Sequence, residues 1–110
     1  MQKYDLIVIG SGSGLDVASA AVQQGRLKVA IIEKDRMGGT CLNSGCIPSK
    51  LLIHSADVAE TISRAHVFGI KVEGFRVDFQ VMVERVNDIT DSSSERIRNA
   101  FDGIENPIPE

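Results

Sequence analysis

The sequence has 110 residues, of which 43% are hydrophobic and 25% are charged, as is typical of a globular protein with one domain and a modest core. The net charge of −3 gives no electrostatic reason to expect nucleic acid or an anionic membrane as a partner. No stretch approaches the roughly 20 apolar residues that span a bilayer, and the N-terminus lacks the apolar core of a secretory signal, so we expect a cytoplasmic protein without membrane contact.

The first third of the chain predicts a βαβ unit. Residues 5–9 are rich in β-branched side chains and predict a buried strand. A glycine cluster at residues 10–14 follows, and apolar residues at helical spacing predict a helix over residues 15–24. Residues 29–32 predict a second strand, which ends at Glu33. Strand, glycine turn, helix and strand in about thirty residues are typical of an α/β fold with a parallel sheet.

The middle of the chain predicts a loop followed by a helix. Gly38 and Gly39 open the loop, which runs to Gly45. Pro48 fits the first turn of the helix, where its missing N–H costs nothing. Apolar residues at helical spacing carry this helical region as far as Gly69.

The last third of the chain predicts a second long helix. A short extended segment at residues 70–75 precedes Asp78, which can cap a helix whose apolar stripe runs to Phe101. The polar run at residues 91–95 weakens the prediction of helix in the middle of this segment. Residues 105–110 contain two prolines and cannot continue a helix.

The glycine cluster matches most of a dinucleotide-binding fingerprint. Gly10 permits the tight turn, and Gly12 lets the backbone approach a pyrophosphate at the N-terminus of the following helix. The third position holds Leu15 instead of Gly or Ala, which puts the contact between helix and strand in question, although Gly14 can share this task. Glu33 can accept hydrogen bonds from ribose hydroxyls and would repel a 2′-phosphate, so we do not expect NADP at this loop. The alternative is a glycine-rich turn that binds no ligand.

Cys41 and Cys46 have four residues between them, in a loop that leads into a helix. A thiol near a helix N-terminus lies in a positive field that stabilises the thiolate, which is the species that attacks disulfides. A disulfide that closes so small a loop gains little from unfolded-state entropy. The spacing therefore favours a catalytic pair over a structural one.

Other interpretations of the cysteines stay open on spacing alone. They could be two free buried thiols, or half of a zinc site, although zinc usually takes four ligands at closer spacing. We interpret His54 and His66, which lie well downstream, as ordinary helix residues. Lys50 lies four residues after Cys46 and could lower a thiolate pKa or polarise a flavin ring if the helix begins that early. Otherwise it is a solvated surface lysine.

Residues 38–50, with the sequence GGTCLNSGCIPSK, closely resemble the active-site signature of the class I pyridine nucleotide–disulfide oxidoreductases. The similarity is clear over residues 4–70 and looser beyond them. It implies a Rossmann-like FAD-binding domain with a parallel sheet. Residues 1–110 would be an N-terminal fragment of that domain, without the NAD(P)H-binding and dimerisation domains. The acid–base histidine of the family would lie outside this chain, and neither His54 nor His66 matches it.

The resemblance also implies roles for individual residues. Cys46 would be the sulfur beside the flavin, which forms a charge-transfer contact as a thiolate, and Cys41 would be the interchange thiol that attacks the substrate disulfide. Lys50 would lie near the flavin N5 and pair with a glutamate from another part of the enzyme. Glu33 would hold the adenosine ribose. The full cofactor-binding set implied is Gly10, Gly12, Ser13, Gly14, Glu33, Lys34, Gly39, Thr40, Cys41, Gly45, Cys46 and Lys50.

The activity implied by the resemblance is that of an FAD-dependent disulfide oxidoreductase. Electrons would pass between NAD(P)H, FAD and the cysteine pair to a small disulfide or lipoyl substrate, in a homodimer. Residues 47–50 look most like dihydrolipoamide dehydrogenases, whereas residues 10–14 and 56–62 look more like mycothione reductases; glutathione and mercuric reductases are further relatives. We expect the 110-residue chain to be inactive alone and to self-associate through exposed apolar surface. The alternative function, which the departure at Leu15 motivates, is a non-catalytic dinucleotide-binding or assembly module.

Overall fold

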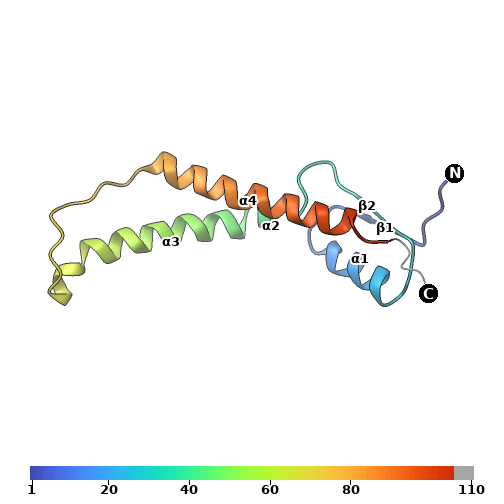
Figure 1. The fold of residues 1–110 in the computed structure, drawn as a ribbon, viewed down its shortest axis with the longest axis horizontal. Helices are drawn as coiled ribbons and strands as arrows, with labels where there is room; N and C mark the ends of the chain where they lie inside the picture. The colour runs from blue at the N-terminus through green and yellow to red at the C-terminus, as the bar shows by residue number, and fades with distance from the viewer. Residues whose placement is uncertain (106–110) are drawn as a thin grey trace.

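A computed structural model describes residues 1–105, which form a molecule with one long axis. The extents are 67 × 25 × 18 Å and the radius of gyration is 20.5 Å, whereas a compact chain of this length would have a radius of about 13 Å. Figure 1 shows why. A βαβ unit, which we call the head (residues 1–36), lies at one end, and two long helices side by side, which we call the hairpin (residues 46–102), extend away from it.

The head contains three elements, as the sequence predicts: β1 (Leu6–Ile9), α1 (Gly14–Gln23) and β2 (Val29–Ile32). The two strands are parallel and pair along their whole length, from Leu6 opposite Val29 to Ile9 opposite Ile32. The prediction of an α/β fold with a parallel sheet is confirmed.

The core of the head lies on one face of the two strands. Ala18 and Val22 of α1 pack there against Val29 of β2, and all three side chains are buried. The alternation along β1 turns Ile7 and Ile9 to the opposite face, where they are exposed. The head therefore buries one side of its sheet and leaves the other side open to solvent.

The prediction of a loop from Gly38 to Gly45 is wrong over most of its length. The structure has a short helix there, α2 (Gly39–Ser44), between two glycines that lie outside helical geometry. Six residues are too few to show an apolar periodicity, and no capping side chain marks the start of the helix. The signals used to predict helices were therefore missing from this segment.

The outgoing half of the hairpin consists of α3 (Cys46–Ser63) and a short 3₁₀ helix, η1 (Ala65–Phe68). Pro48 lies in the first turn of α3, as predicted. Gly69 ends the helical region with a left-handed φ of 74°. Residues 70–78 then lead back without forming a helix or a strand, so the extended segment that we predicted there does not join the sheet.

The returning half of the hairpin is α4 (Phe79–Asp102), which runs back beside α3 to the head (Figure 1). Asp78 caps the helix as predicted, because its side chain accepts a hydrogen bond from the backbone N–H of Val81 at 3.1 Å. At its far end Phe101 packs against the core of the head. Within residues 1–105, no helix is both long and apolar enough to cross a membrane.

The prediction that the polar run at residues 91–95 weakens this helix is wrong, because α4 is continuous through it. The hydroxyls of Thr90 and Ser92 donate to carbonyls of the preceding turn, so they remain satisfied within the helix. Thr90 and Ser94 are buried on the inner side of α4. The prediction for residues 105–110 falls largely on residues 106–110, which lie outside the described part of the chain.

Candidate functional site

A hollow of about 370 Å³, which we call the cleft, lies where the carboxyl ends of the two parallel strands meet α2. Ligands of open α/β sheets bind at this end of the strands. The residues that line the cleft are Gly10, Ser11, Gly12, Glu33, Lys34, Asp35, Arg36, Gly39, Thr40, Asn43 and Ser44. The structure thus brings together six members of the predicted cofactor-binding set: Gly10, Gly12, Glu33, Lys34, Gly39 and Thr40.

The glycine loop leaves open space and free donors beside the cleft. A Cβ atom placed on Gly12 would meet no atom closer than the Cα of Gly39, at 4.0 Å. Within residues 1–105, the backbone N–H groups of Gly12, Ser13 and Gly14 have no hydrogen-bond acceptor, as expected at the N-terminus of a helix. Free N–H groups at the positive end of a helix are suited to phosphate oxygens.

Gly14 makes the close contact between α1 and β1 that the fingerprint normally assigns to its third position. A Cβ atom on Gly14 would lie 2.7 Å from Cγ1 of Val8, so a larger side chain there would displace the strand or its side chain. Gly14 therefore compensates for the absence of Gly or Ala at position 15, the third position of the fingerprint. Gly14 packs against the strand and does not line the cleft.

Glu33 binds the glycine loop directly. Its Oε2 accepts hydrogen bonds from the backbone N–H of Ser11 at 2.9 Å and from the Ser11 hydroxyl at 2.5 Å. Its Oε1 accepts from the backbone N–H groups of Lys34 at 2.8 Å and Asp35 at 3.0 Å. These bonds, led by the one from the Ser11 hydroxyl, hold the pKa of Glu33 below its usual value, although partial burial opposes them. Glu33 is therefore ionised at neutral pH, and any ribose hydroxyl would share oxygens that already accept hydrogen bonds from the protein.

The turn before α2 lies against the glycine loop. The buried Ser11 hydroxyl accepts a hydrogen bond from the backbone N–H of Gly38 at 3.0 Å. Gly38 and Gly39 both have left-handed φ values, of 107° and 67°. A Cβ atom on Gly39 would lie 2.7 Å from the Cα of Gly12, so only glycine permits this approach of the two backbones. The two glycine segments thus form one rigid wall of the cleft.

The two cysteines lie in the first turns of two consecutive helices. Cys41 is in the first turn of α2, and Cys46 is the first residue of α3. Both are exposed free thiols, and they lie close enough for Cys46 to raise the pKa of Cys41. Gly45 allows this approach, because a Cβ atom there would lie 3.0 Å from the carbonyl oxygen of Thr40 and 3.2 Å from the Cα of Cys41.

The neighbouring Cys46 thiol raises the pKa of Cys41, and the partial removal of Cys41 from solvent acts in the same direction. The charge of Lys50 opposes this shift but is the weakest of the contributions. A hydrogen bond from the backbone N–H of Cys46 also lowers the pKa of Cys41 but does not reverse the shift.

The remaining predicted residues lie outside the cleft lining. Ser13 is exposed and makes no capping hydrogen bond to α1. Lys50 is exposed on α3 one turn after Cys46, on the same side of the helix, because α3 does begin that early. His54 and His66 are exposed on the hairpin, away from the cleft. Among residues 1–105, no group of three or more His, Cys, Asp or Glu side chains could hold a metal ion.

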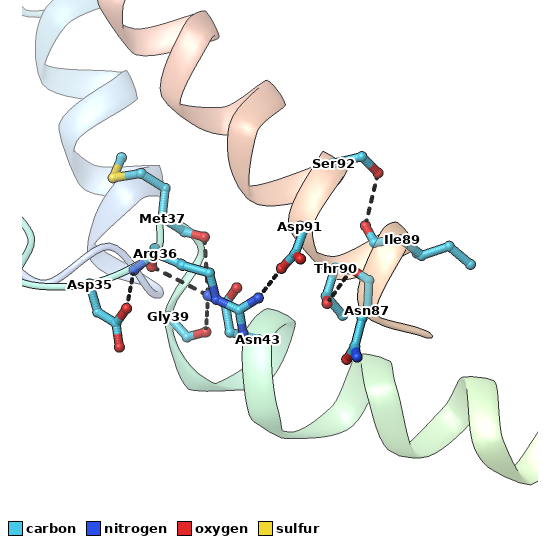
Figure 2. Close-up of polar contacts among 10 residues, drawn as sticks. All are labelled: Asp35, Arg36, Met37, Gly39, Asn43, Asn87, Ile89, Thr90, Asp91 and Ser92. Atoms are coloured by element: carbon cyan, nitrogen blue, oxygen red, sulfur yellow. Dashed lines mark hydrogen bonds and ion pairs between the residues drawn. The ribbon is translucent and has the colours of Figure 1, made fainter. Parts of the chain in front are cut away.

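Sequence reasoning missed five residues that line the cleft: Ser11, Asp35, Arg36, Asn43 and Ser44. Figure 2 shows one of them, Asn43, whose amide nitrogen donates to the carbonyls of Arg36, Met37 and Gly39 at 3.3, 3.1 and 2.9 Å. The guanidinium of Arg36 in turn forms an ion pair with Asp91 of α4. In the sequence, the only sign of this network is the position of Asn43 between Gly39 and Gly45.

Comparisons with known proteins find one matching family and several similar sequences. The sequence model of the family described as pyridine nucleotide-disulphide oxidoreductase matches residues 4–103. A dihydrolipoyl dehydrogenase of Chlamydia pneumoniae is 43% identical over 103 residues, which cover 94% of this chain and 22% of that protein.

Two further relatives extend the comparison to other bacteria. A dihydrolipoyl dehydrogenase of Bacillus subtilis (strain 168) is 40% identical over 89 residues, covering 81% of this chain and 19% of that protein. A mycothione reductase of Mycobacterium tuberculosis (strain CDC 1551 / Oshkosh) is 42% identical over 86 residues, covering 78% of this chain and 18% of that protein. The chain spans about a fifth of the length of the curated relatives it matches.

Proposed function

Because the chain belongs to the pyridine nucleotide-disulphide oxidoreductase family, we propose that it forms the FAD-binding and redox-cysteine region of an FAD-dependent disulfide oxidoreductase similar to dihydrolipoyl dehydrogenases. The observation that carries the proposal is the continuity of the site. Gly39 and Thr40 line the cleft, Cys41 follows them directly in α2, and Cys46 begins the next helix, α3. A nucleotide site and a dithiol are thus joined through one short helix.

The features of the cleft fit the pyrophosphate and ribose of FAD. The open side of Gly12 and the unpaired N–H groups at the start of α1 suit phosphate oxygens, and the ionised Glu33 suits hydroxyl donors. When bound, FAD would supply electron transfer between the nicotinamide and the thiols. The NAD(P)H-binding and dimerisation parts would belong to a longer protein, in line with the chain's small share of its relatives' length.

The two thiols suffice for exchange with a disulfide substrate. The thiolate of Cys41 attacks one sulfur of the substrate, forms a mixed disulfide and releases the other sulfur as a thiol once it takes up a proton. The sulfur of Cys46, after losing its proton, then attacks Cys41 Sγ, which closes the Cys41–Cys46 disulfide and releases the second substrate thiol. In the opposite direction, a dihydrolipoyl dithiol reduces the Cys41–Cys46 disulfide by the same two exchanges, and FAD, when bound, would supply the route by which the two electrons leave the reduced cysteines.

The test is turnover by the full-length protein that contains this chain. Wild type should take up FAD, appear yellow, and oxidise dihydrolipoamide or reduce a small disulfide with a nicotinamide cofactor. Cys46→Ser should retain flavin but lose that turnover, because the second exchange has no nucleophile. Turnover by Cys46→Ser equal to that of wild type would reject the roles of the cysteines.

A second candidate is a non-catalytic dinucleotide-binding or assembly module. The observation in its favour was Leu15, and the contact of Gly14 with Val8 now accounts for that departure. A protein that stays colourless after incubation with FAD would favour this alternative over the oxidoreductase.

A further inference from the structure

The turn at residues 36–39 supports the first redox cysteine, because α2 begins at the last residue of this turn, Gly39, and carries Cys41 in its first turn. A turn with two consecutive left-handed glycines has many alternative conformations when it is unsupported. Something must therefore select the one conformation that directs α2, and hence Cys41, towards the start of α3.

One side-chain amide provides most of the hydrogen bonds to this turn. The Nδ2 of Asn43 donates to the carbonyl oxygens of Arg36, Met37 and Gly39, which are three of the four residues of the turn (Figure 2). Its Oδ1 is buried and has no hydrogen-bond partner within the described residues. The amide orientation is thus set by the three carbonyls, since the reversed amide would place oxygen against oxygen.

We propose that Asn43 is a positioning residue for the dithiol: by holding the 36–39 turn it sets the place of Cys41 against Cys46 and so favours the disulfide between them. The inference rests on the proposed function, in which this pair is the redox centre. Asn43 lies two residues after Cys41 on the same short helix, so loosening of the turn would be transmitted to the thiol through a single helical turn.

The experiment measures the equilibrium between dithiol and disulfide in the 110-residue chain with a glutathione redox buffer. In this reaction both thiols lose a proton and form the S–S bond, while glutathione disulfide takes up two electrons and two protons and becomes two thiols. Acid quenching and mass spectrometry give the disulfide fraction at each glutathione ratio. No flavin or nicotinamide takes part, so a failure of the chain to bind FAD would leave this measurement intact and would count only against the proposed function.

Asn43→Asp keeps the shape of the side chain but replaces the donor with a carboxylate oxygen. We expect the equilibrium constant for disulfide formation to fall about tenfold, equivalent to a rise of about 30 mV in midpoint potential. The matched control is Asn87→Asp, which makes the same change on an exposed face of α4, and it should leave the constant unchanged. An equal constant for Asn43→Asp and Asn87→Asp would overturn the inference.

Two further variants separate positioning from stability. Asn43→Ala removes the donors without adding charge, and Asn43→Ser keeps one donor, so the constants should fall in the order wild type, Asn43→Ser, Asn43→Ala. Circular dichroism at the assay temperature verifies that each variant is folded, and this series serves if Asn43→Asp does not fold. A purely structural role would lower the unfolding temperatures while leaving the constants equal, and that result would also overturn the inference.

Discussion

The carboxylate of Glu33 connects the glycine loop to the end of β2, because it accepts hydrogen bonds from Ser11. Ser11 is almost fully buried, and its hydroxyl both donates to Glu33 and accepts from Gly38. A glycine cluster and an acidic residue after the second strand could be predicted from the sequence because each has its own local pattern. The serine between them could not, because its role depends on two partners that are distant in sequence.

The low pKa of Glu33 predicts how stability depends on pH. A carboxyl whose pKa is lower in the folded than in the unfolded state adds stability above the unfolded value, and that stability is lost as the pH falls through the folded value. Because the Ser11 hydroxyl lowers the pKa of Glu33, the free energy of unfolding should decrease as the pH falls below about 4.3, the ordinary value for glutamate. Urea unfolding at a series of pH values measures this.

Glu33→Gln should show less of this acid dependence than wild type, because it removes the group that titrates. The control is Glu73→Gln, at an exposed position in the segment between the two hairpin helices, which should retain the wild-type dependence. If Glu33→Gln and wild type lost stability in parallel as the pH falls, the hydrogen bonds of Glu33 would not matter in solution.

At the scale of elements, the parallel strands and the three longer helices could be predicted from apolar periodicity and from caps such as Asp78. The short helix α2 could not, because its start is held by the close contact of Gly39 with the glycine loop and by the side-chain amide of Asn43, which no local sequence pattern reveals. The continuity of α4 through residues 91–95 was missed for a related reason. Thr90 and Ser94 look unfavourable in a helix but face the buried side of α4.

The contact between α2 and the glycine loop predicts the effect of a single methyl group. Gly39→Ala combines a left-handed φ with a Cβ atom 2.7 Å from the Cα of Gly12. Gly69→Ala has nearly the same left-handed φ but meets no atom within 4 Å, so it should cost only the backbone strain of about 1 kcal/mol. Gly39→Ala should cost at least about 1 kcal/mol more, because the two backbones must separate.

Denaturant unfolding of both variants gives this difference. Binding of FAD should weaken only in Gly39→Ala, since Gly69 lies far from the cleft lining. Equal losses of stability in the two variants would mean that the loop and α2 do not meet as closely as described.

At the scale of the molecule, the head leaves an apolar face uncovered. Ile7, Ile9 and Ile32 are 54%, 86% and 55% exposed on the open side of the two-stranded sheet. A hollow of about 410 Å³, which Glu33, Arg98 and Asp102 line together with apolar side chains, lies between α1, β2 and the end of α4. Surfaces of this kind are normally covered by other strands, domains or subunits.

The isolated 110-residue chain should therefore self-associate, and its sedimentation coefficient should rise with concentration. Ile9→Lys places a charge on the open face and should shift the chain towards monomer. Gln23→Lys adds the same charge at an exposed position of α1 that is not on this face, and it should leave self-association unchanged. A wild-type chain that sediments as a monomer at high concentration would contradict this expectation.

In the proposed function, Cys46 and a flavin in the cleft would form one redox unit, with Cys41 facing the substrate. The most direct measurement is the absorbance spectrum of the FAD-loaded, full-length protein after reduction by two electrons. A long-wavelength charge-transfer band between thiolate and flavin should appear in wild type, persist in Cys41→Ser and be absent from Cys46→Ser. Failure to bind flavin, or a band of equal strength in Cys46→Ser, would contradict the account.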